Sequence, residues 1–272
     1  MKESSQVSIW SYDDTSRQPK LSLDEWNKSE CPFCKERLPE LHWRGGDGNI
    51  HQGMRSTRVG VCQICGWWRA EEYLISSGDR SGTQYRAHRA IVSSLKHLNL
   101  TDITTPVEDV RRYLAAKYEA RFHVHPKLME ETVASVFRDH GYEAKVTGRS
   151  GDDGVDVILV KGRDQIGVQV KRYKNLIQVE QIRSLQGALV LNGLTKGIFV
   201  TTSGFQSGGK GTVRRLAERG YAIELFDAER FYGALSIAQR SMYGSRREFD
   251  QDHQLPSMLP IVFSEGTRER PF

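Results

Sequence analysis

The four cysteines of this chain fall into two Cys-x-x-Cys pairs, Cys31 with Cys34 and Cys62 with Cys65. Each pair can form a tight turn that directs two sulfurs at one point, and two such turns supply the ligands of a tetrahedral structural zinc site. The alternatives are two disulfides or four buried thiols. Because disulfides are rare in a reducing cytoplasm and no cysteine is left over, the spacing favours a zinc ribbon with one Zn²⁺.

Length and composition predict a folded chain with two modules. A length of 272 residues exceeds a typical single domain, and 38% apolar with 27% charged residues is ordinary for a soluble protein. The net charge of +5 favours polyanionic partners without identifying one. No segment has the composition of a signal peptide or a membrane span, so we expect a cytoplasmic protein with no membrane partner.

The first half of the chain is predicted to hold an N-terminal arm (residues 1–28), the zinc ribbon (29–78) and a helical connector (79–125). In the connector, spacings of three or four residues predict a helix from about Ser81, through Tyr85, His88, Ile91, Val92, Leu95 and Leu98. A second helix is predicted over residues 107–122, because Pro106 and the acidic Glu108 and Asp109 are typical of a helix start.

The second half is predicted to be an α/β domain over residues 126–235. Periodicity and turn signals indicate a helix at 127–140, strands at 142–147, 155–160 and 165–172, a helix through 179–189 and a strand at 197–202. A helix at 212–219, a strand at 221–226 and a last short helix follow. The order is α-β-β-β-α-β, and residues 236–272 are expected to be an extended tail or an interaction segment.

A constellation of polar residues lies on two of these strands. Side chains alternate along a strand, so Gln169 and Lys171 share one face of the third strand. Asp156 lies at the beginning of the neighbouring predicted strand, directly after a glycine-rich loop. The two strands are predicted to form a hairpin. One carboxylate, one amide oxygen and one ammonium are therefore expected to converge, although a simple ion pair between Asp156 and Lys171 would produce the same pattern.

This set of residues suits hydrolysis of a phosphodiester bond by a nuclease that uses Mg²⁺. Such a site needs oxygen ligands for the cation and a positive group near the attacking water. We expect Asp156, the Gln169 amide oxygen and the backbone carbonyl of Val170 to hold Mg²⁺. Lys171 is expected to orient or deprotonate the water and to stabilise the charge that develops on the phosphate.

Three motifs make this region resemble the Mrr-like type IV restriction endonucleases of the PD-(D/E)xK nuclease superfamily. They are Asp-x-Gly-x-Asp at 152–156, Gln-x-Lys at 169–171 and Lys-Gly-x-Phe-Val-Thr-Thr-Ser at 196–203. The resemblance covers about residues 126–235 and implies a restriction-endonuclease-like mixed sheet, DNA cleavage with Mg²⁺ and a catalytic glutamate on the first helix. The matching spacing assigns that role to Glu130, with Glu131 as a possible substitute.

Further expectations concern partners. The DNA backbone is expected to meet basic residues near the site, namely Arg172, Lys174, Lys210, Arg214 and Arg215. Cutting both strands of duplex DNA requires two active sites, so a homodimer or higher oligomer is expected, and a partner protein of a phage-defence system is possible. The alternatives are a DNA-binding or scaffold protein that does not cleave, and a nuclease for RNA or branched DNA.

Overall fold

The structure is a computed structural model, and it describes residues 9–11, 30–38, 42–45, 54–77, 83–147, 154–242 and 261–268. The chain divides into two compact units. Unit 1 comprises Met1–His97 with Ser245–Phe272, and unit 2 comprises Leu98–Gly244. In the described part of the chain, no helix is long and apolar enough to cross a membrane.

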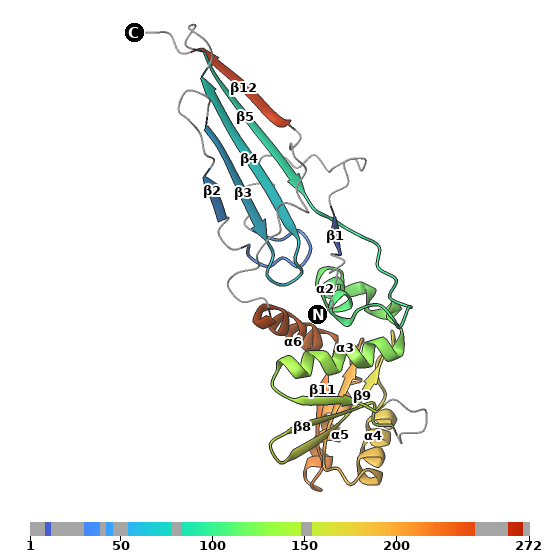
Figure 1. Cartoon of the computed structure of the whole chain (residues 1–272). Coiled ribbons are helices and arrows are strands. Elements are labelled where there is room, and N and C mark those ends of the chain that lie inside the picture. The colour runs from blue at the N-terminus through green and yellow to red at the C-terminus, as the bar shows by residue number, and fades with distance from the viewer. Residues whose placement is uncertain are drawn as a thin grey trace. The chain divides into compact units, whose positions relative to one another are not determined.

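Unit 1 is built on a five-stranded antiparallel sheet with the order β12-β5-β4-β3-β2 (Figure 1). A second, two-stranded sheet pairs β1 with β6. The strands of the large sheet are β2 (His42–Gly45), β3 (Met54–Val61), β4 (Trp68–Ser77), β5 (Thr83–Val92) and β12 (Ile261–Arg268), and those of the small sheet are β1 (Trp10–Ser11) and β6 (Ser94–Leu95).

The predicted helix from Ser81 is wrong, because residues 83–92 form the strand β5. This strand pairs with β4 from Gln84 to Val92 and with β12 on its other side. The same residues also fit a period of two, since Tyr85, Ala87 and Ile91 occupy odd positions. Backbone pairing with the preceding strand β4 on one side and with the distant strand β12 on the other therefore selects the extended form.

The expectation of an extended tail over residues 236–272 also needs correction. The helix α6 (Ala228–Met242) continues past residue 236, and β12 joins the sheet of unit 1 at its edge. The partner of β12 is β5, far away in the sequence, so the strand has no local signal such as a hairpin turn. Most of the predicted arm, together with Asp152 and Asp153, lies outside the described residues.

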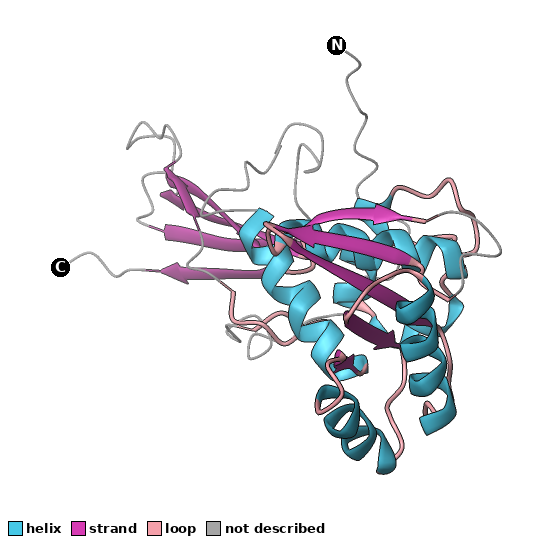
Figure 2. Ribbon diagram, turned by 90° about the horizontal axis from the view of Figure 1, so that it is seen from below, coloured by secondary structure: helices cyan, strands magenta, loops and turns pink. Residues whose placement is uncertain are grey.

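Unit 2 contains a five-stranded mixed sheet with the order β11-β10-β9-β8-β7, surrounded by helices (Figure 2). Its elements in chain order are α2 (Val107–Ala116), the 3₁₀ helix η1 (Tyr118–His123), α3 (Pro126–Asp139), β7 (Glu143–Val146), β8 (Val157–Lys161), β9 (Asp164–Lys171), α4 (Val179–Leu191), β10 (Lys196–Thr201), α5 (Gly208–Ala217), β11 (Ala222–Phe226) and α6.

This order confirms the predicted α/β fold class, since α3-β7-β8-β9-α4-β10 is the α-β-β-β-α-β core. The hairpin of β8 and β9 is antiparallel, and β9, β10 and β11 are parallel to one another. The two largest differences from the expected boundaries are that α2 ends at Ala116 before η1, and that α5 begins at Gly208 rather than near Thr212.

The core packs helices on both faces of the sheet. On one face, apolar residues of α4 and α5 pack against Phe199 of β10 and Ile223 of β11. On the other face, Phe137 of α3 makes an edge contact with Phe226 of β11, with ring centroids 5.7 Å apart. The β9–β10 register pairs Lys171 with Thr201, so the carboxyl ends of these parallel strands meet at one edge of the sheet. This edge carries the candidate site.

Candidate active site and metal centre

Asp156 directly precedes β8 and lies beside the end of β9. Its backbone N–H donates to the Val168 carbonyl at 2.8 Å, and its Oδ2 accepts from the Val170 N–H at 2.7 Å. The N–H and the hydroxyl of Thr147 each donate to the Asp156 carbonyl at 3.0 Å. These contacts hold the partly buried carboxylate at the edge of the sheet where β9 ends.

Gln169 carries a buried oxygen that suits a metal ligand. Its side chain is 5% exposed, and its Oε1 has no hydrogen-bond partner among the described residues. A buried acceptor without a partner destabilises a fold by about 1–3 kcal/mol. A divalent cation bound to this oxygen would remove that penalty. With the Asp156 carboxylate nearby, the donors are hard oxygens of the kind that Mg²⁺ prefers, so the residues present fit this cation.

Gly154 lies close to the side-chain amide of Gln169. A Cβ at this position would lie 3.2 Å from Gln169 Nε2 and 3.4 Å from the Cβ of Ala188. The residue also has a φ of 85°, which side chains rarely adopt. The glycine before Asp156 therefore allows the chain to approach the amide closely, as the glycine-rich sequence predicts.

Glu130 on α3 lies within electrostatic reach of this pair. Desolvation, followed by the negative charge of Asp156, raises the pKa of the half-buried Glu130 carboxyl from 4.5 to about 7. Lys171 acts in the opposite direction and lowers this pKa. Glu131 points elsewhere, since its carboxylate lies 4.0 Å from the Arg138 guanidinium. The geometry thus supports Glu130 over Glu131 for the glutamate of the site.

The raised pKa of Glu130 leads to a testable dependence of stability on pH. The folded state favours the protonated carboxyl, so ionised Glu130 opposes folding when no metal is bound. We expect the stability of the wild type relative to Glu130→Gln to fall as pH rises from about 4.5 to about 7, and to remain constant above that. Thermal unfolding of both proteins in EDTA across this pH range measures the difference.

Glu131→Gln is the matched control for this measurement, because it removes a partly exposed carboxylate one residue away. Its stability relative to the wild type should show no comparable fall over the same range. A flat difference for Glu130→Gln would mean that neither burial nor the charge of Asp156 raises the pKa of Glu130. Adding Mg²⁺ should reduce the effect at Glu130, since a nearby cation favours the ionised carboxyl.

Lys171 completes the set of predicted site residues. It is the last residue of β9, it is partly buried, and its carbonyl accepts from the Thr202 N–H at 3.1 Å. Strand alternation places it on the same face as Gln169. Its effect on the pKa of Glu130 requires the two side chains to be neighbours. The structure therefore gathers Glu130, Asp156, Gln169 and Lys171 at one edge, and their catalytic roles remain a prediction.

The predicted DNA contacts fall into two groups. In the first, Arg172 donates a hydrogen bond to the Phe122 carbonyl within the protein, while Lys174 is exposed with its Nζ 5.9 Å from the centre of the Phe122 ring. The second group lies on α5 and is exposed: Lys210, Arg214 and Arg215. Lys210 is in the first turn of α5, shortly after the end of β10. Of the two groups, Arg172 and Lys174 are closer to Lys171 in the sequence.

Sequence reasoning missed Arg121 of η1. Its Nε donates to the Thr202 carbonyl at 2.8 Å, and its guanidinium lies 4.6 Å from the Tyr118 ring centre and 4.1 Å from that of Phe122. These contacts fix the chain that follows β10. The nearby aromatic residues, Phe122 directly after Arg121 and Tyr118 three residues before it, are the only signal in the sequence that could have indicated this packing.

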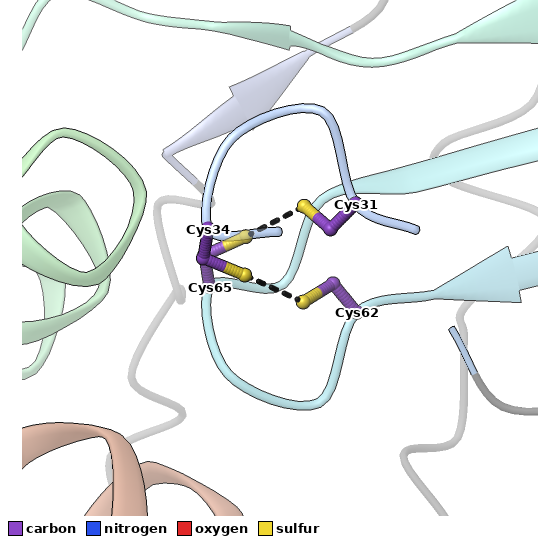
Figure 3. A group of neighbouring side chains, drawn as sticks. All are labelled: Cys31, Cys34, Cys62 and Cys65. Carbon is purple, nitrogen blue, oxygen red and sulfur yellow. Dashed lines mark hydrogen bonds between the residues drawn. The ribbon is translucent and has the colours of Figure 1, made fainter. Parts of the chain in front are cut away.

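The four cysteines form a cluster in unit 1. Figure 3 shows that the sulfurs of Cys31, Cys34, Cys62 and Cys65 converge from two loops. All four sulfurs lie within 4.8 Å of one another, with 3.5 Å between Cys31 and Cys65 and 3.4 Å between Cys34 and Cys62. A tetrahedral site with Zn–S bonds of about 2.3 Å places its sulfurs about 3.8 Å apart, so the cluster fits Zn²⁺.

The two loops have the same backbone geometry. In each, the N–H of the residue after the second cysteine donates to the carbonyl of the first, at 3.0 Å from Lys35 to Cys31 and at 2.9 Å from Gly66 to Cys62. Lys35 and Gly66 both have positive φ, at 62° and 80°. Hydrogen bonds, first from Cys31, hold the pKa of the Cys62 thiol below its ordinary range, and hydrogen bonds, again first with Cys31, raise the pKa of Cys65.

Comparison with known proteins assigns the fold of unit 2. Residues 123–235 match the family model Mrr_cat, described as restriction endonuclease. The type IV methyl-directed restriction enzyme EcoKMrr of Escherichia coli (strain K12) is 30% identical over 120 residues. This alignment covers 41% of the present chain and 38% of the relative, so the chain spans well under half of the relative's length.

Among solved structures, the DNA modification-dependent restriction endonuclease AspBHI is similar with a TM-score of 0.34 and 16% sequence identity. The alignment covers 50% of the present chain and 36% of that chain. The family match and the curated relative agree with the α-β-β-β-α-β core described above. Residues 123–235 are therefore similar to the Mrr_cat family of restriction endonuclease domains.

Proposed function

We propose that the chain is a Mg²⁺-dependent endonuclease that hydrolyses phosphodiester bonds in double-stranded DNA. The observation that carries the proposal is the buried Gln169 Oε1, which has no hydrogen-bond partner among the described residues and lies on the strand that binds the Asp156 carboxylate. An unpartnered acceptor beside a carboxylate suits a cation. The family match adds that proteins with this domain are restriction endonucleases.

Each residue of the site has a defined task in this proposal. Asp156, the Gln169 amide oxygen and the Val170 backbone carbonyl would hold Mg²⁺, which would polarise the scissile phosphate. Lys171 orients the attacking water or accepts its proton, and its positive charge stabilises the charge that develops on the phosphate. Glu130, with a pKa raised to about 7, is able to hold or release a proton near neutral pH.

The test is incubation of the purified chain with plasmid and phage DNA, modified and unmodified, with Mg²⁺ and with EDTA. Nicking or linearisation that requires Mg²⁺ would support the proposal. Equal cleavage in EDTA would contradict the role of the metal. Binding without cleavage of any DNA would favour a scaffold protein that has retained the fold. Preferential cleavage of RNA or branched DNA would mean that this nucleic acid, and not duplex DNA, is the substrate.

The remaining parts of the proposal concern the protein as a whole. We infer that the four cysteines bind one structural Zn²⁺, and that the enzyme acts in the cytoplasm in restriction or phage defence. A homodimer would bring two sites to the two strands of a duplex. Sedimentation of the chain with and without DNA tests this assembly, and a monomer that cuts both strands in one event would contradict it.

A further inference from the structure

The segment that follows β10 makes a regular series of hydrogen bonds with the chain that follows Lys171. The Thr202 N–H donates to the Lys171 carbonyl at 3.1 Å, and the Thr202 hydroxyl donates to the Tyr173 carbonyl at 2.9 Å. The Ser203 hydroxyl then donates to the Asn175 carbonyl at 2.7 Å. Beyond the end of β9, side-chain hydroxyls thus donate the hydrogen bonds that backbone N–H groups donate between strands within the sheet.

A second set of contacts holds this chain segment from the side of η1. Arg172 donates to the Phe122 carbonyl, and Arg121 donates to the Thr202 carbonyl at 2.8 Å. At the far end, the N–H of Ile177 donates to the Gly204 carbonyl at 2.8 Å. The loop Arg172–Leu176 is therefore fixed along its backbone at both ends and in the middle.

The side chains of this fixed loop are nevertheless exposed. Tyr173 is 45% exposed and Leu176 is 55% exposed, although both are large and apolar. Lys174 and Asn175 between them are exposed as well. The hydroxyls of the buried Thr202 and the partly buried Ser203 hold the loop backbone, while the apolar side chains of Tyr173 and Leu176 remain exposed. Exposed apolar side chains on a loop whose backbone is fixed suit contact with a partner.

The location of the loop indicates the partner. Tyr173 follows Lys171 by two residues, so it lies no more than about 7 Å from it along the chain. The grooves of B-DNA are about 6 Å and 12 Å wide, so a loop at this distance from a bound phosphate can reach the adjacent groove. Proteins that enter a DNA groove commonly combine cationic side chains with an apolar residue that contacts sugars or base steps.

We propose that the loop Arg172–Leu176 is a preformed DNA-contacting element that enters a groove beside the scissile phosphate. Tyr173 and Leu176 make apolar contacts with sugars and base edges, and Lys174 contacts a backbone phosphate. Thr202 and Ser203 are positioning residues, because they hold the loop backbone without touching DNA. This proposal rests on the proposed nuclease function and gives the Thr-Thr-Ser motif a physical role.

Binding of the full chain to a short DNA duplex in EDTA tests the proposal without cleavage. We expect Tyr173→Ala to weaken binding by roughly 10-fold, as loss of an aromatic contact to a base does, and Tyr173→Phe to bind like the wild type. Loss of an apolar contact should leave the slope of log K against log salt concentration unchanged. Lys174→Ala should instead reduce the magnitude of that slope by about 1, because one phosphate contact is lost.

Leu176→Ala has a matched control in Leu191→Ala. Leu191 is 72% exposed at the end of α4, and the chain passes from there to the start of β10, at the edge of the sheet opposite Lys171. We expect Leu176→Ala to weaken binding and Leu191→Ala to have no effect. If Tyr173→Ala and Leu176→Ala both bind like Leu191→Ala, the loop proposal is overturned, while plasmid cleavage by the wild type leaves the nuclease proposal standing. If the wild type neither binds nor cuts DNA, both proposals fail.

The positioning role of Thr202 is tested by a pair of variants. Thr202→Val removes the hydroxyl that donates to the Tyr173 carbonyl and keeps the shape of the side chain, whereas Thr202→Ser keeps the hydroxyl. We expect Thr202→Val to raise KM for DNA more than it lowers kcat, and Thr202→Ser to restore KM. A value of KM for Thr202→Val equal to that of the wild type would overturn the role of this residue.

Discussion

Asp156→Ala is expected to reduce DNA cleavage by about 10³-fold or more, because it removes the carboxylate that holds the cation beside the phosphate. Lys171→Ala is expected to reduce the cleavage rate by about 10²–10³-fold, the effect of losing one group that stabilises developing charge. Both variants should remain folded, since Asp156 and Lys171 are at the edge of the sheet and only partly buried. Plasmid cleavage with Mg²⁺, under single-turnover conditions, measures both rates.

The matched control for Lys171→Ala is Lys161→Ala. Lys161 is an exposed lysine at the end of β8, where the register pairs it with Asp164 at the hairpin turn, away from Asp156. Its loss should leave cleavage unchanged. Binding of DNA in EDTA should be similar for the wild type and Lys171→Ala, within the effect of one positive charge. Cleavage by Asp156→Ala at the wild-type rate would contradict the assignment of the site.

The second large effect is expected in unit 1, where Cys62→Ser should abolish zinc binding. Structural zinc contributes about 10–16 kcal/mol of apparent binding free energy in small zinc domains, and this energy stabilises the fold. Three of the four cysteines are fully buried, so water cannot replace a thiolate ligand unless the surrounding structure opens. We expect one zinc per chain in the wild type, little in Cys62→Ser, and loss of the unfolding transition of unit 1.

Metal analysis of protein purified without added zinc, followed by calorimetry, makes this measurement. Phe33→Ala is the control, because Phe33 lies between two cysteines and contacts Trp10, at 4.8 Å between ring centroids, but offers no ligand. It should retain zinc. The zinc assignment would be contradicted if the wild type held well under one zinc per chain and Cys62→Ser unfolded at the same temperature as the wild type.

Much of the candidate site could be predicted from spacing alone. Gln169 and Lys171 are two residues apart on one strand, so alternation places them on one face whatever the rest of the chain does. Asp156 was expected to meet them through a hairpin, and the β8–β9 pairing confirms that hairpin. The cysteine cluster was predicted on the same basis, because each Cys-x-x-Cys turn is a local structure.

Other features of the site depend on the tertiary structure. The unpartnered Gln169 Oε1, the raised pKa of Glu130 and the exposure of Tyr173 each result from what surrounds the residue. Those surroundings include α3, η1 and the end of β10, which are distant in the sequence. The Thr-Thr-Ser motif illustrates the difference: the sequence marks it as a family motif, and only the structure shows that its hydroxyls hold the loop after Lys171.

Short-range geometry made three features predictable: the paired cysteines, the shared face of Gln169 and Lys171, and the order of elements in the α/β domain. Long-range pairing, in contrast, makes residues 83–92 a strand and joins residues 261–268 to them in one sheet. A strand is stabilised by hydrogen bonds to neighbouring strands, which can come from anywhere in the chain, whereas a turn or a helix satisfies its own backbone locally.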